Sequence, residues 1–491
     1  MIFLSSILRD IWHYTNYWSQ YLIAVIIVIV IIYLILEHRD PNKTLSWILV
    51  IILVPIVGLI LFYFLGKNYR KKRIFTKKGI ADIRQTEKLI AWQSEHLLDD
   101  LDIKNTNVLS KIGIIKLLIN NNKALLTHNN KVTILNNGNE TFPAIFEALK
   151  NAKHHIHLEY YMIEEGEIGE QLKSILIEKA KQGVEVRLIY DDVGSWGLSN
   201  EYINDLADAG INAHAFIPVR FPRFAQKINF RNHRKIIIVD GKTGFIGGLN
   251  FADRYLYGVP DVGFWRDTHL KIEGTSVGSL QVIFLTDWYF TTDQLLNEQI
   301  YFQKFNPCEK CLVQIATSGP DSDWDSIMQA YFYTISTAHN YLYISTPYFI
   351  PNESILTAIK TVALSGVDVK IILPSRNDSK LTYYGSMSYI KELLEANVSI
   401  FMYNRGFTHS KVLIVDDIIS SVGTANMDLR SFDQNFEVNA IIYDEKISVK
   451  LKEFFLEDLT YCEKLNLETY NKRPIARRIA EGIARIFSPI L

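Results

Sequence analysis

Two stretches of the chain carry the same reactive side chains at the same spacing. HRKIIIVD covers residues 233–240, and HSKVLIVD covers residues 409–416. Each holds a histidine, a lysine and an aspartate at matching positions: His233, Lys235 and Asp240 in the first copy, His409, Lys411 and Asp416 in the second. In both copies the histidine and the lysine are two positions apart and precede an apolar run. On a strand, side chains at this spacing point to the same side. Because a lysine directed into a protein interior is costly unless an anion meets it, the repetition favours one shared site over two strand ends in water.

An asparagine follows each histidine at the same distance, 17 residues later. The run GGLN ends at Asn250, and the run GTAN ends at Asn426. A turn after the first apolar run would fold the next strand back on it and place Asn250 opposite residue 232 or 233. The same construction brings Asn426 beside His409. Each copy therefore gathers His, Lys and Asn at one end of a predicted hairpin.

The carboxylates near the two copies have different expected roles. Asp240 and Asp416 lie seven positions after their histidines, and this odd spacing points them to the other face of the strand. A role in the turn is at least as well supported for them as a chemical role. Asp267 in WRDTH and Glu437 in NFEVN, each about 30 residues beyond its histidine, are candidates to fix the histidine tautomers. Surface exposure is the alternative for both.

These side chains together suit phosphoryl transfer. Two lysines and two asparagines would form a cationic, donor-rich pocket for a phosphoryl group. One histidine can attack phosphorus, while the other protonates the leaving alkoxide and then deprotonates the incoming hydroxyl. Since no carboxylate cluster of metal-ligand spacing accompanies them, the lysines would take the charge-neutralising role of Mg²⁺. We therefore expect no metal and no cofactor.

The order of predicted elements is repeated along the chain. A strand-like run, a helix and a GV-x-V strand follow one another in residues 152–191 and again in residues 338–374. Such a repeat predicts an internal duplication of an α/β unit. We expect an α/β fold with two duplicated domains, over residues 126–300 and 301–469, around one shared active site.

The hydrophobic residues are concentrated at the N-terminus. Residues 21–36 form an uninterrupted apolar run, and residues 45–65 form a longer one that Pro55 and Gly58 would kink. Together they predict a two-span transmembrane hairpin over residues 1–66. Because the first run is short for a span, a re-entrant or tilted hairpin is the alternative.

Charged and amphipathic segments flank the predicted domains. A juxtamembrane linker is expected over residues 67–125, and it begins with seven lysines and arginines between residues 67 and 78. This cluster predicts that the rest of the chain is cytoplasmic, and it could also bind anionic lipids. In residues 470–491, isoleucines recur along one helical face and arginines along the other, which predicts either an interfacial helix or a helix packed on the catalytic body. The net charge of −1 gives no overall attraction for nucleic acid.

Beyond the paired motif, several segments share a known pattern. HxKxxxxD followed by GGLN or GTAN resembles the signature of the phospholipase D superfamily. RDPNKTLSWILV, LEYYMIE, FWRDTH, TPYFIP and GTANMDLRSFDQNFEVN are similar to segments of bacterial-type cardiolipin synthases. The resemblance covers nearly the whole chain, and the N-terminal hairpin with RDP-x-KT is its most specific part.

The resemblance implies an activity and a set of roles. Two phosphatidylglycerols would condense to cardiolipin and glycerol through a phosphatidyl-histidine, without metal, at the bacterial cytoplasmic membrane. His233 and His409 would be the nucleophile and acid pair, with His233 the nucleophile. The lysines and asparagines would bind the phosphate, and an acidic residue downstream would orient each histidine. Gly248 and Thr424 stand where serine is common, so the two halves need not be chemically equivalent.

Other functions remain open from the motifs alone. If water were the acceptor, the protein would be a phospholipase D. If the acceptor were a different alcohol, the protein would be another phosphatidyltransferase. A non-catalytic membrane lipid sensor is a further alternative, although neither copy of the motif has lost its histidine or lysine.

Overall fold

The computed structural model describes residues 2–36, 41–62, 107–219, 229–296, 298–303, 309–376 and 378–486. The chain divides into an N-terminal unit, residues 1–69 with 220–229, and a catalytic unit that contains the remainder. The basic cluster after residue 66 and most of the expected linker lie outside the described residues.

The N-terminal unit consists of helices α1 (Ile2–Leu36), α2 (Pro41–Leu53) and α3 (Pro55–Leu61). The second apolar run is broken at Val54, whose φ of −134° and ψ of 74° leave the helical region directly before Pro55. Gly58 lets α3 approach α2 closely, because a Cβ there would lie 2.8 Å from the Cα of Ile51. The predicted kink is therefore present.

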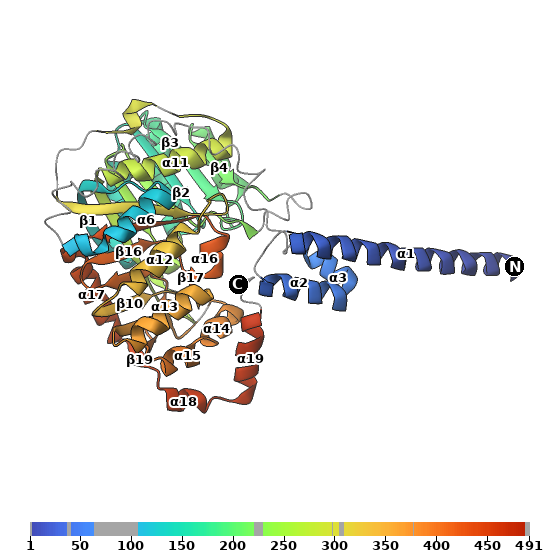
Figure 1. The fold of residues 1–491 in the computed structure, drawn as a ribbon. Helices are drawn as coiled ribbons and strands as arrows, with labels where there is room; N and C mark the ends of the chain where they lie inside the picture. The colour runs from blue at the N-terminus through green and yellow to red at the C-terminus, as the bar shows by residue number, and fades with distance from the viewer. Residues whose placement is uncertain are drawn as a thin grey trace. The chain divides into compact units, whose positions relative to one another are not determined.

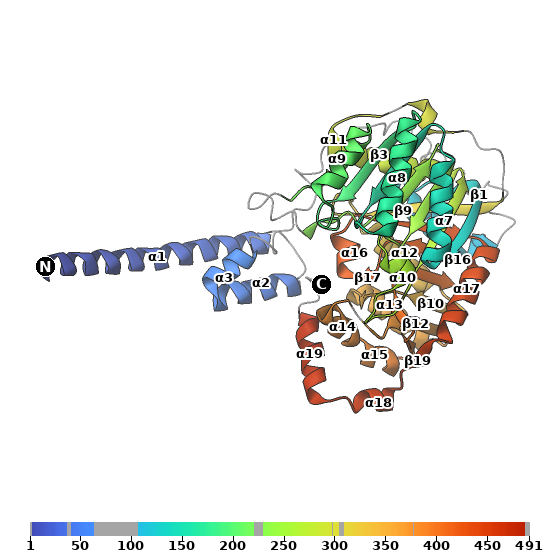
Figure 2. The same ribbon diagram turned by 180° about the vertical axis from the view of Figure 1, so that it is seen from behind.

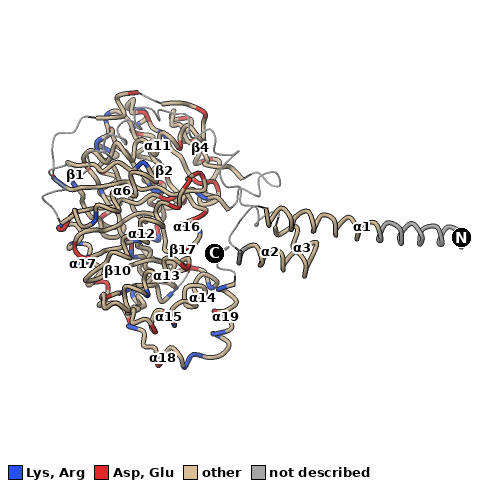
Figure 3. The backbone as a smooth tube through the Cα atoms, in the orientation of Figure 1, with Lys and Arg blue, Asp and Glu red and all other residues tan. Residues whose placement is uncertain are grey.

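Most described side chains of α1 to α3 are apolar and face outward. Leu34, Ile51 and Phe62 form a small buried cluster, while Leu22, Val25 and their neighbours are exposed. Figure 3 shows no charged residue in α3 or in the described part of α1. Over the residues that the structure describes, no helix combines the length and hydropathy needed to cross a membrane, so the two predicted spans are not found there.

The catalytic unit is built on one 15-stranded sheet (Figures 1 and 2). Its first half, from the outer edge inward, has the order β4-β3-β2-β5-β6-β8-β1, and its second half has the order β13-β12-β10-β15-β16-β18-β9. The innermost strands β1 and β9 pair with each other, and the short strand β19 follows β13 at the far edge. Since both halves repeat one strand order, the duplication predicted from the sequence is confirmed.

The strands have these bounds in the first half: β1 Thr127–Asn136, β2 His155–Tyr160, β3 Glu185–Asp191, β4 Asn212–Phe216, β5 Lys235–Val239, β6 Thr243–Gly247 and β8 Thr268–Gly274. Those of the second half are β9 Cys311–Ser318, β10 Tyr341–Ser345, β12 Asp368–Pro374, β13 Ser399–Tyr403, β15 Val412–Val415, β16 Ile419–Gly423, β18 Glu437–Tyr443 and β19 Cys462–Lys464. Two small ladders join β7 Phe264–Arg266 to β14 Gly406–Thr408, and β11 Phe349–Ile350 to β17 Met427–Asp428.

Helices cover both halves of the sheet and bury two large cores. The first half carries α7 Asn137–Lys150, α8 Glu167–Lys181, α9 Asn200–Asp208, α10 Arg254–Tyr257 and α11 Ser276–Thr292. The second half carries α6 Ile112–Asn122, α12 Ser326–Ser336, α13 Glu353–Leu364, α14 Lys380–Met387, α15 Ile390–Glu395, α16 Leu429–Asp433 and α17 Glu445–Leu459, and α18 Leu467–Asn471 and α19 Ile475–Ile486 end the described chain. Short 3₁₀ turns lie at Asn107–Lys111 and Gln299–Tyr301.

The sheet folds over at its centre. The register between β1 and β9 shifts between Thr127 and Asn130, and beyond this irregularity β16 contacts β6 and β8 while β18 contacts β6. The inner faces of the two halves therefore meet. As a result, the first residues of β8 and β18 come close to the opposite half.

Candidate active site

His233 lies two residues before the buried strand β5, and its ring binds a carboxylate from the other half of the molecule. Its backbone N–H donates to the carbonyl of Phe436 at 2.9 Å. Its Nδ1 lies 3.0 and 2.9 Å from the two carboxylate oxygens of Glu437, which is fully buried at the start of β18. A donated Nδ1–H leaves Nε2 with its lone pair directed away from Glu437.

His409 has the matching arrangement in the second half. Its N–H donates to the carbonyl of Arg266 at 2.6 Å, and its Nδ1 lies 2.7 Å from the carboxylate of Asp267. The sequence interpretation that paired each histidine with the acid about 30 residues downstream is therefore wrong. The acids are exchanged between the halves, because the fold at the centre of the sheet brings the start of each acid-bearing strand to the opposite histidine.

The two lysines are buried beside the histidines. Lys235 Nζ donates to the carbonyl of His233 at 2.8 Å, and Lys411 Nζ donates to that of His409 at 2.6 Å. Burial, together with the charge of Lys411, lowers the pKa of Lys235 to about 7. Burial likewise lowers the pKa of Lys411 to about 8. A bound anion would reverse both shifts, since it compensates the desolvated positive charges.

The histidines are neutral in this environment. Burial and the two lysine charges lower the pKa of His233 to about 4. Burial, with Lys411, Lys235 and His233 nearby, holds the pKa of His409 well below its usual range. A neutral imidazole oriented by a carboxylate is the form that can attack an electrophile through Nε2.

The two asparagines occupy equivalent positions in the repeat, and each has a side-chain oxygen without a hydrogen-bond partner among the described residues. The pairing of β5 with β6 ends at Ile236 and Ile246, before Asn250 is reached, so the predicted place of Asn250 opposite residue 232 or 233 stays a prediction. Asn250 donates through Nδ2 to the hydroxyl of Tyr255 at 2.6 Å. The Oδ1 atoms of Asn250 and Asn426 are both buried, and neither finds a hydrogen-bond partner among the described residues. If the Asn250 amide is turned over, the Tyr255 hydroxyl donates to Oδ1 and the free N–H₂ faces the site.

The aspartates of the paired motif lie at the opposite ends of their strands, away from the histidines. Asp240 accepts hydrogen bonds from the backbone N–H groups of Lys153, His154 and His155 at 2.7–3.2 Å. Asp416 accepts the equivalent three, from residues 339, 340 and 341, at 2.8–3.0 Å. Both sit in the left-handed region, with φ of 54° and 55°. Each aspartate therefore holds the backbone that leads into a neighbouring strand, β2 or β10, and its role in the reaction stays a prediction.

The two His–carboxylate pairs differ in one hydroxyl group. Thr424 donates to Glu437 at 2.5 Å, whereas Gly248 offers no such group and an added Cβ there would collide with the carboxylate of Asp267. Burial would raise the pKa of Glu437, but His233 and Thr424 together hold it below its usual value. Burial raises the pKa of Asp267 to about 6. The halves are thus chemically distinct, and His233 has the more strongly ionised carboxylate.

Two tyrosines complete the site although their sequence context did not single them out. The Tyr161 ring lies 4.9 Å from that of His233, with Lys235 Nζ 5.1 Å above it. The Tyr255 ring lies 5.5 Å from that of His409. Tyr161 could have been found from its place directly after β2, because Tyr160 in β2 pairs with Lys235. That pairing joins strands far apart in the sequence, so only the tertiary structure reveals it.

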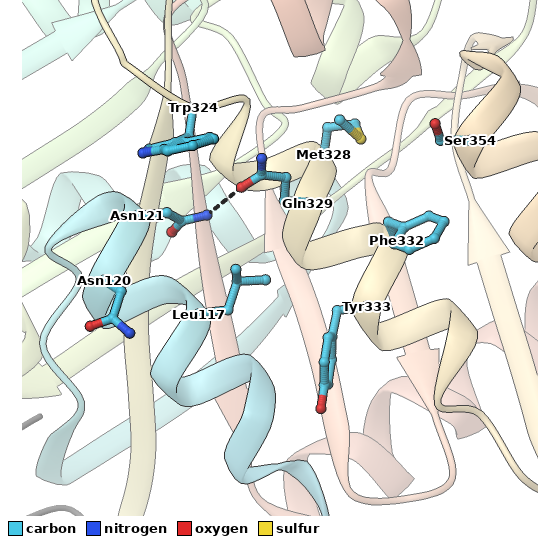
Figure 4. A pocket seen from close by; sticks show the side chains of 9 residues that line it. All are labelled: Leu117, Asn120, Asn121, Trp324, Met328, Gln329, Phe332, Tyr333 and Ser354. Atoms are coloured by element: carbon cyan, nitrogen blue, oxygen red, sulfur yellow. Dashed lines mark hydrogen bonds between the residues drawn. The ribbon is translucent and has the colours of Figure 1, made fainter.

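Beyond this site, the described residues hold no metal-binding cluster, and the second half has an apolar groove. No group of three or more metal-binding side chains occurs among the described residues. A groove of about 580 Å³ lies between α6 and α12, where Figure 4 shows Trp324, Met328 and Phe332 along an apolar wall and the bond from Asn121 to Gln329, 2.7 Å long. This groove holds no acid–base group that could act on a phosphoryl centre.

The comparisons with known proteins agree with this geometry. Residues 145–288 and 331–459 match the family described as "Cardiolipin synthase, PLD-like domain", once in each half of the sheet. The chain belongs to the cardiolipin synthase family. Residues 23–67 match the family described as "Phospholipase_D-nuclease N-terminal". The family match places one PLD-like unit around His233 and another around His409.

Curated members of the cardiolipin synthase family are similar to this chain along its whole length. A cardiolipin synthase of Geobacillus sp. (strain WCH70) is 43% identical over 100% of this chain and 99% of that protein. The major cardiolipin synthase ClsA of Bacillus subtilis (strain 168) is 40% identical over 95% of this chain and 97% of that protein. Among solved structures, the phosphatidylserine synthase of Haemophilus influenzae Rd KW20 has the same fold, with a TM-score of 0.60, 16% identity, and coverage of 78% of this chain and 100% of that one.

Proposed function

We propose that this enzyme condenses two phosphatidylglycerol molecules to cardiolipin and glycerol through a phosphatidyl-histidine. The observation that carries the proposal is the exchanged pair of dyads, His233 with Glu437 and His409 with Asp267, in which each histidine also has a buried lysine bound to its carbonyl. Relatives named cardiolipin synthase along the whole length of the chain support the same activity.

In the first step, Nε2 of His233 attacks the phosphorus of one phosphatidylglycerol. The N–P bond forms, the bond from phosphorus to the glycerol oxygen breaks, and His409 gives its proton to that oxygen. The negative charge of the bound phosphodiester raises the pKa of His409 against the effect of the lysines, so that it can hold this proton. Lys235, Lys411 and the amide groups of Asn250 and Asn426 stabilise the charge on the phosphoryl oxygens.

In the second step, a hydroxyl of the glycerol headgroup of another phosphatidylglycerol enters. His409, now neutral, removes its proton while the oxygen attacks phosphorus and the N–P bond to His233 breaks. Cardiolipin leaves and His233 is regenerated. Because leaving group and acceptor are both alcohols, one histidine can serve as acid and then as base. Glu437 stabilises the positive charge that develops on His233, and its low pKa keeps it ionised for this role.

We also propose a membrane arrangement for the enzyme. The N-terminal unit would anchor the chain as a two-span hairpin in the bacterial cytoplasmic membrane, with domains 126–300 and 301–469 on the cytoplasmic side. The exposed apolar side chains of α1 to α3 support contact with an apolar medium. A cysteine introduced at the exposed Glu201 should react with a membrane-impermeant maleimide only after cells are broken, and reaction in intact cells would contradict this topology.

The activity is tested with purified protein and phosphatidylglycerol as the only lipid, in the presence of a chelator. Cardiolipin and glycerol should form in equal amounts, and His233→Ala and His409→Ala should each abolish them. Phosphatidic acid as the main product would instead identify water as the acceptor. Strict metal dependence, or full activity in either histidine variant, would contradict the mechanism. Asp240→Asn is the matched control, because it alters the same motif away from the histidines.

A further inference from the structure

The final helix of the described chain exposes its apolar side. Along α19, Ile475, Ile479, Ile483 and Ile486 are 71%, 58%, 50% and 77% exposed. With 3.6 residues per turn these four side chains lie along one face of a helix about 18 Å long. An amphipathic helix at the surface of a globular protein normally buries such a face against the core. In α19 the opposite face is buried.

Polar groups attach α19 to the catalytic unit. Glu481 is buried and binds Arg473 at 2.9 Å and Arg477 at 3.1 Å. Arg477 also donates to the hydroxyl of Tyr383 in α14 at 3.1 Å, and Arg485 binds Glu392 of α15 at 2.9 Å. The charged face therefore already has its contacts. Turning the helix to bury the isoleucines would break the contacts of Arg477 with Tyr383 and of Arg485 with Glu392.

The position of α19 relates this apolar face to the active site. The helix packs along α14, and Figures 1 and 2 both show the two side by side. The segment before α14 follows the end of β12. Near this end β12 pairs with β10, and β10 pairs in turn with the start of β15, directly after Lys411. In that segment Arg376 donates to the carbonyls of Asp261 and Val262 in the first half. One support of α19, the helix α14, thus begins at the histidine end of the sheet, while the other, α15, leads to the start of β13 at the opposite end.

The neighbouring helix α14 also exposes an apolar side chain. Leu381, in the first turn of that helix, is 44% exposed. Arg478, adjacent to Ile479 in the helix, is exposed and carries positive charge, whereas Lys472, just before the helix, forms an ion pair with Glu468 at 2.8 Å. Isoleucines beside an exposed cation match the boundary of an anionic bilayer, where apolar side chains enter the acyl region and cations meet the headgroups. A protein partner would not require this cation.

We propose that the isoleucine face of α19, together with Leu381, inserts into the surface of an anionic bilayer and holds the active-site loops at the level of the lipid headgroups. This proposal rests on the proposed function, since it concerns how a membrane phospholipid reaches the histidines. The occupant is a lipid surface. The N-terminal helices of the same chain and a second copy of the enzyme are the alternatives that the experiment must separate.

The contact is tested on the full-length protein in vesicles of phosphatidylcholine and phosphatidylserine. After Cys308 and Cys462 are replaced by serine, Ile483→Cys and Leu364→Cys each receive an environment-sensitive fluorophore. Leu364 is the matched control, because it is 64% exposed at the end of α13, before the opposite end of β12. Spin-labelled lipid in the vesicles should quench the fluorophore at position 483 and leave that at 364 unquenched. Absence of quenching at 483 would overturn the proposal, whether water, α1 to α3 or a second copy covers the face.

The functional consequence is tested with two forms of the substrate. Ile479→Ser combined with Ile483→Ser should slow cardiolipin formation from bilayer phosphatidylglycerol about tenfold and leave the rate on short-chain, monomeric phosphatidylglycerol unchanged. Leu364→Ser should change neither rate. Equal loss on both substrates would mean a structural defect, and no loss on vesicles would mean that the face is idle; each overturns the proposal. Failure of the proposed function is distinct, because the unsubstituted enzyme would then form no cardiolipin from either substrate.

Discussion

The exchange of carboxylates between the halves makes a prediction that pairing within each half does not. With His233 as nucleophile, Glu437→Gln should slow formation of the phosphatidyl-histidine, although Glu437 belongs to the other half of the sheet. Glutamine retains one acceptor oxygen for Nδ1–H, so the imidazole keeps its tautomer. What is lost is the negative charge that stabilises the imidazole as it becomes cationic.

The size of this effect follows from the geometry. Both oxygens of Glu437 lie within 3.0 Å of Nδ1 in a fully buried environment. A buried hydrogen bond to a charged group contributes roughly 1.5–3 kcal/mol. At about 1.36 kcal/mol for each factor of ten, adduct formation should slow by about 10-fold to 150-fold. The effect should appear in the rate of the first step, because the charge on His233 develops there.

The assay must separate the nucleophile from the acid. In a phosphatidyl ester of p-nitrophenol the leaving group departs without protonation, so His409 and its partner Asp267 are not needed for adduct formation. Rapid mixing and quenching in alkaline detergent would count labelled lipid phosphate on the protein. Glu437→Gln should be slow and Asp267→Asn close to the unsubstituted rate. If Asp267→Asn slows this step and Glu437→Gln does not, either the pairing or the choice of nucleophile is refuted.

Two further results are expected. Asp240→Ala removes the acceptor of three backbone N–H groups. The free energy of unfolding, measured by chemical denaturation, should therefore fall by roughly 2–4 kcal/mol, while the rate per folded enzyme is unchanged. A loss of rate without a loss of stability would support a chemical role instead. Sulfate, whose own charge is constant, should bind more weakly as pH rises from 7 to 9, because the lysines with pKa values of about 7 and 8 lose the protons that attract it. The decrease should approach tenfold per pH unit for each lysine involved, and calorimetry that finds a constant affinity would contradict this.

Local spacing was sufficient for the parts of the site that lie on one hairpin. His233 and Lys235 are two positions apart, so alternation along one strand predicts that they point to the same side. The same alternation correctly separated Asp240 from the histidine. The duplication could also be predicted, because both halves repeat the order of their elements along the chain.

The N-terminal and C-terminal segments show where pattern is insufficient. The apolar run over residues 45–65 did predict a break near Pro55, since proline removes a backbone donor and collides with the preceding turn. Two spans were not found among the described residues, so that part of the prediction is unsupported by the fold. For residues 475–486, periodicity established that the two faces differ. Which face meets the protein depended on Glu481, Tyr383 and Glu392, which the isoleucine and arginine pattern did not include.

The sequence by itself therefore determined the reactive groups, their spacing and the repeat, because these depend on neighbours within one hairpin or on the order of elements. Only the tertiary structure decided that Glu437 serves His233 and that Asp267 serves His409. Those bonds join residues 204 and 142 positions apart, and they exist because the sheet folds over where β1 meets β9. No local periodicity encodes that fold, since it results from the packing of two complete halves against each other.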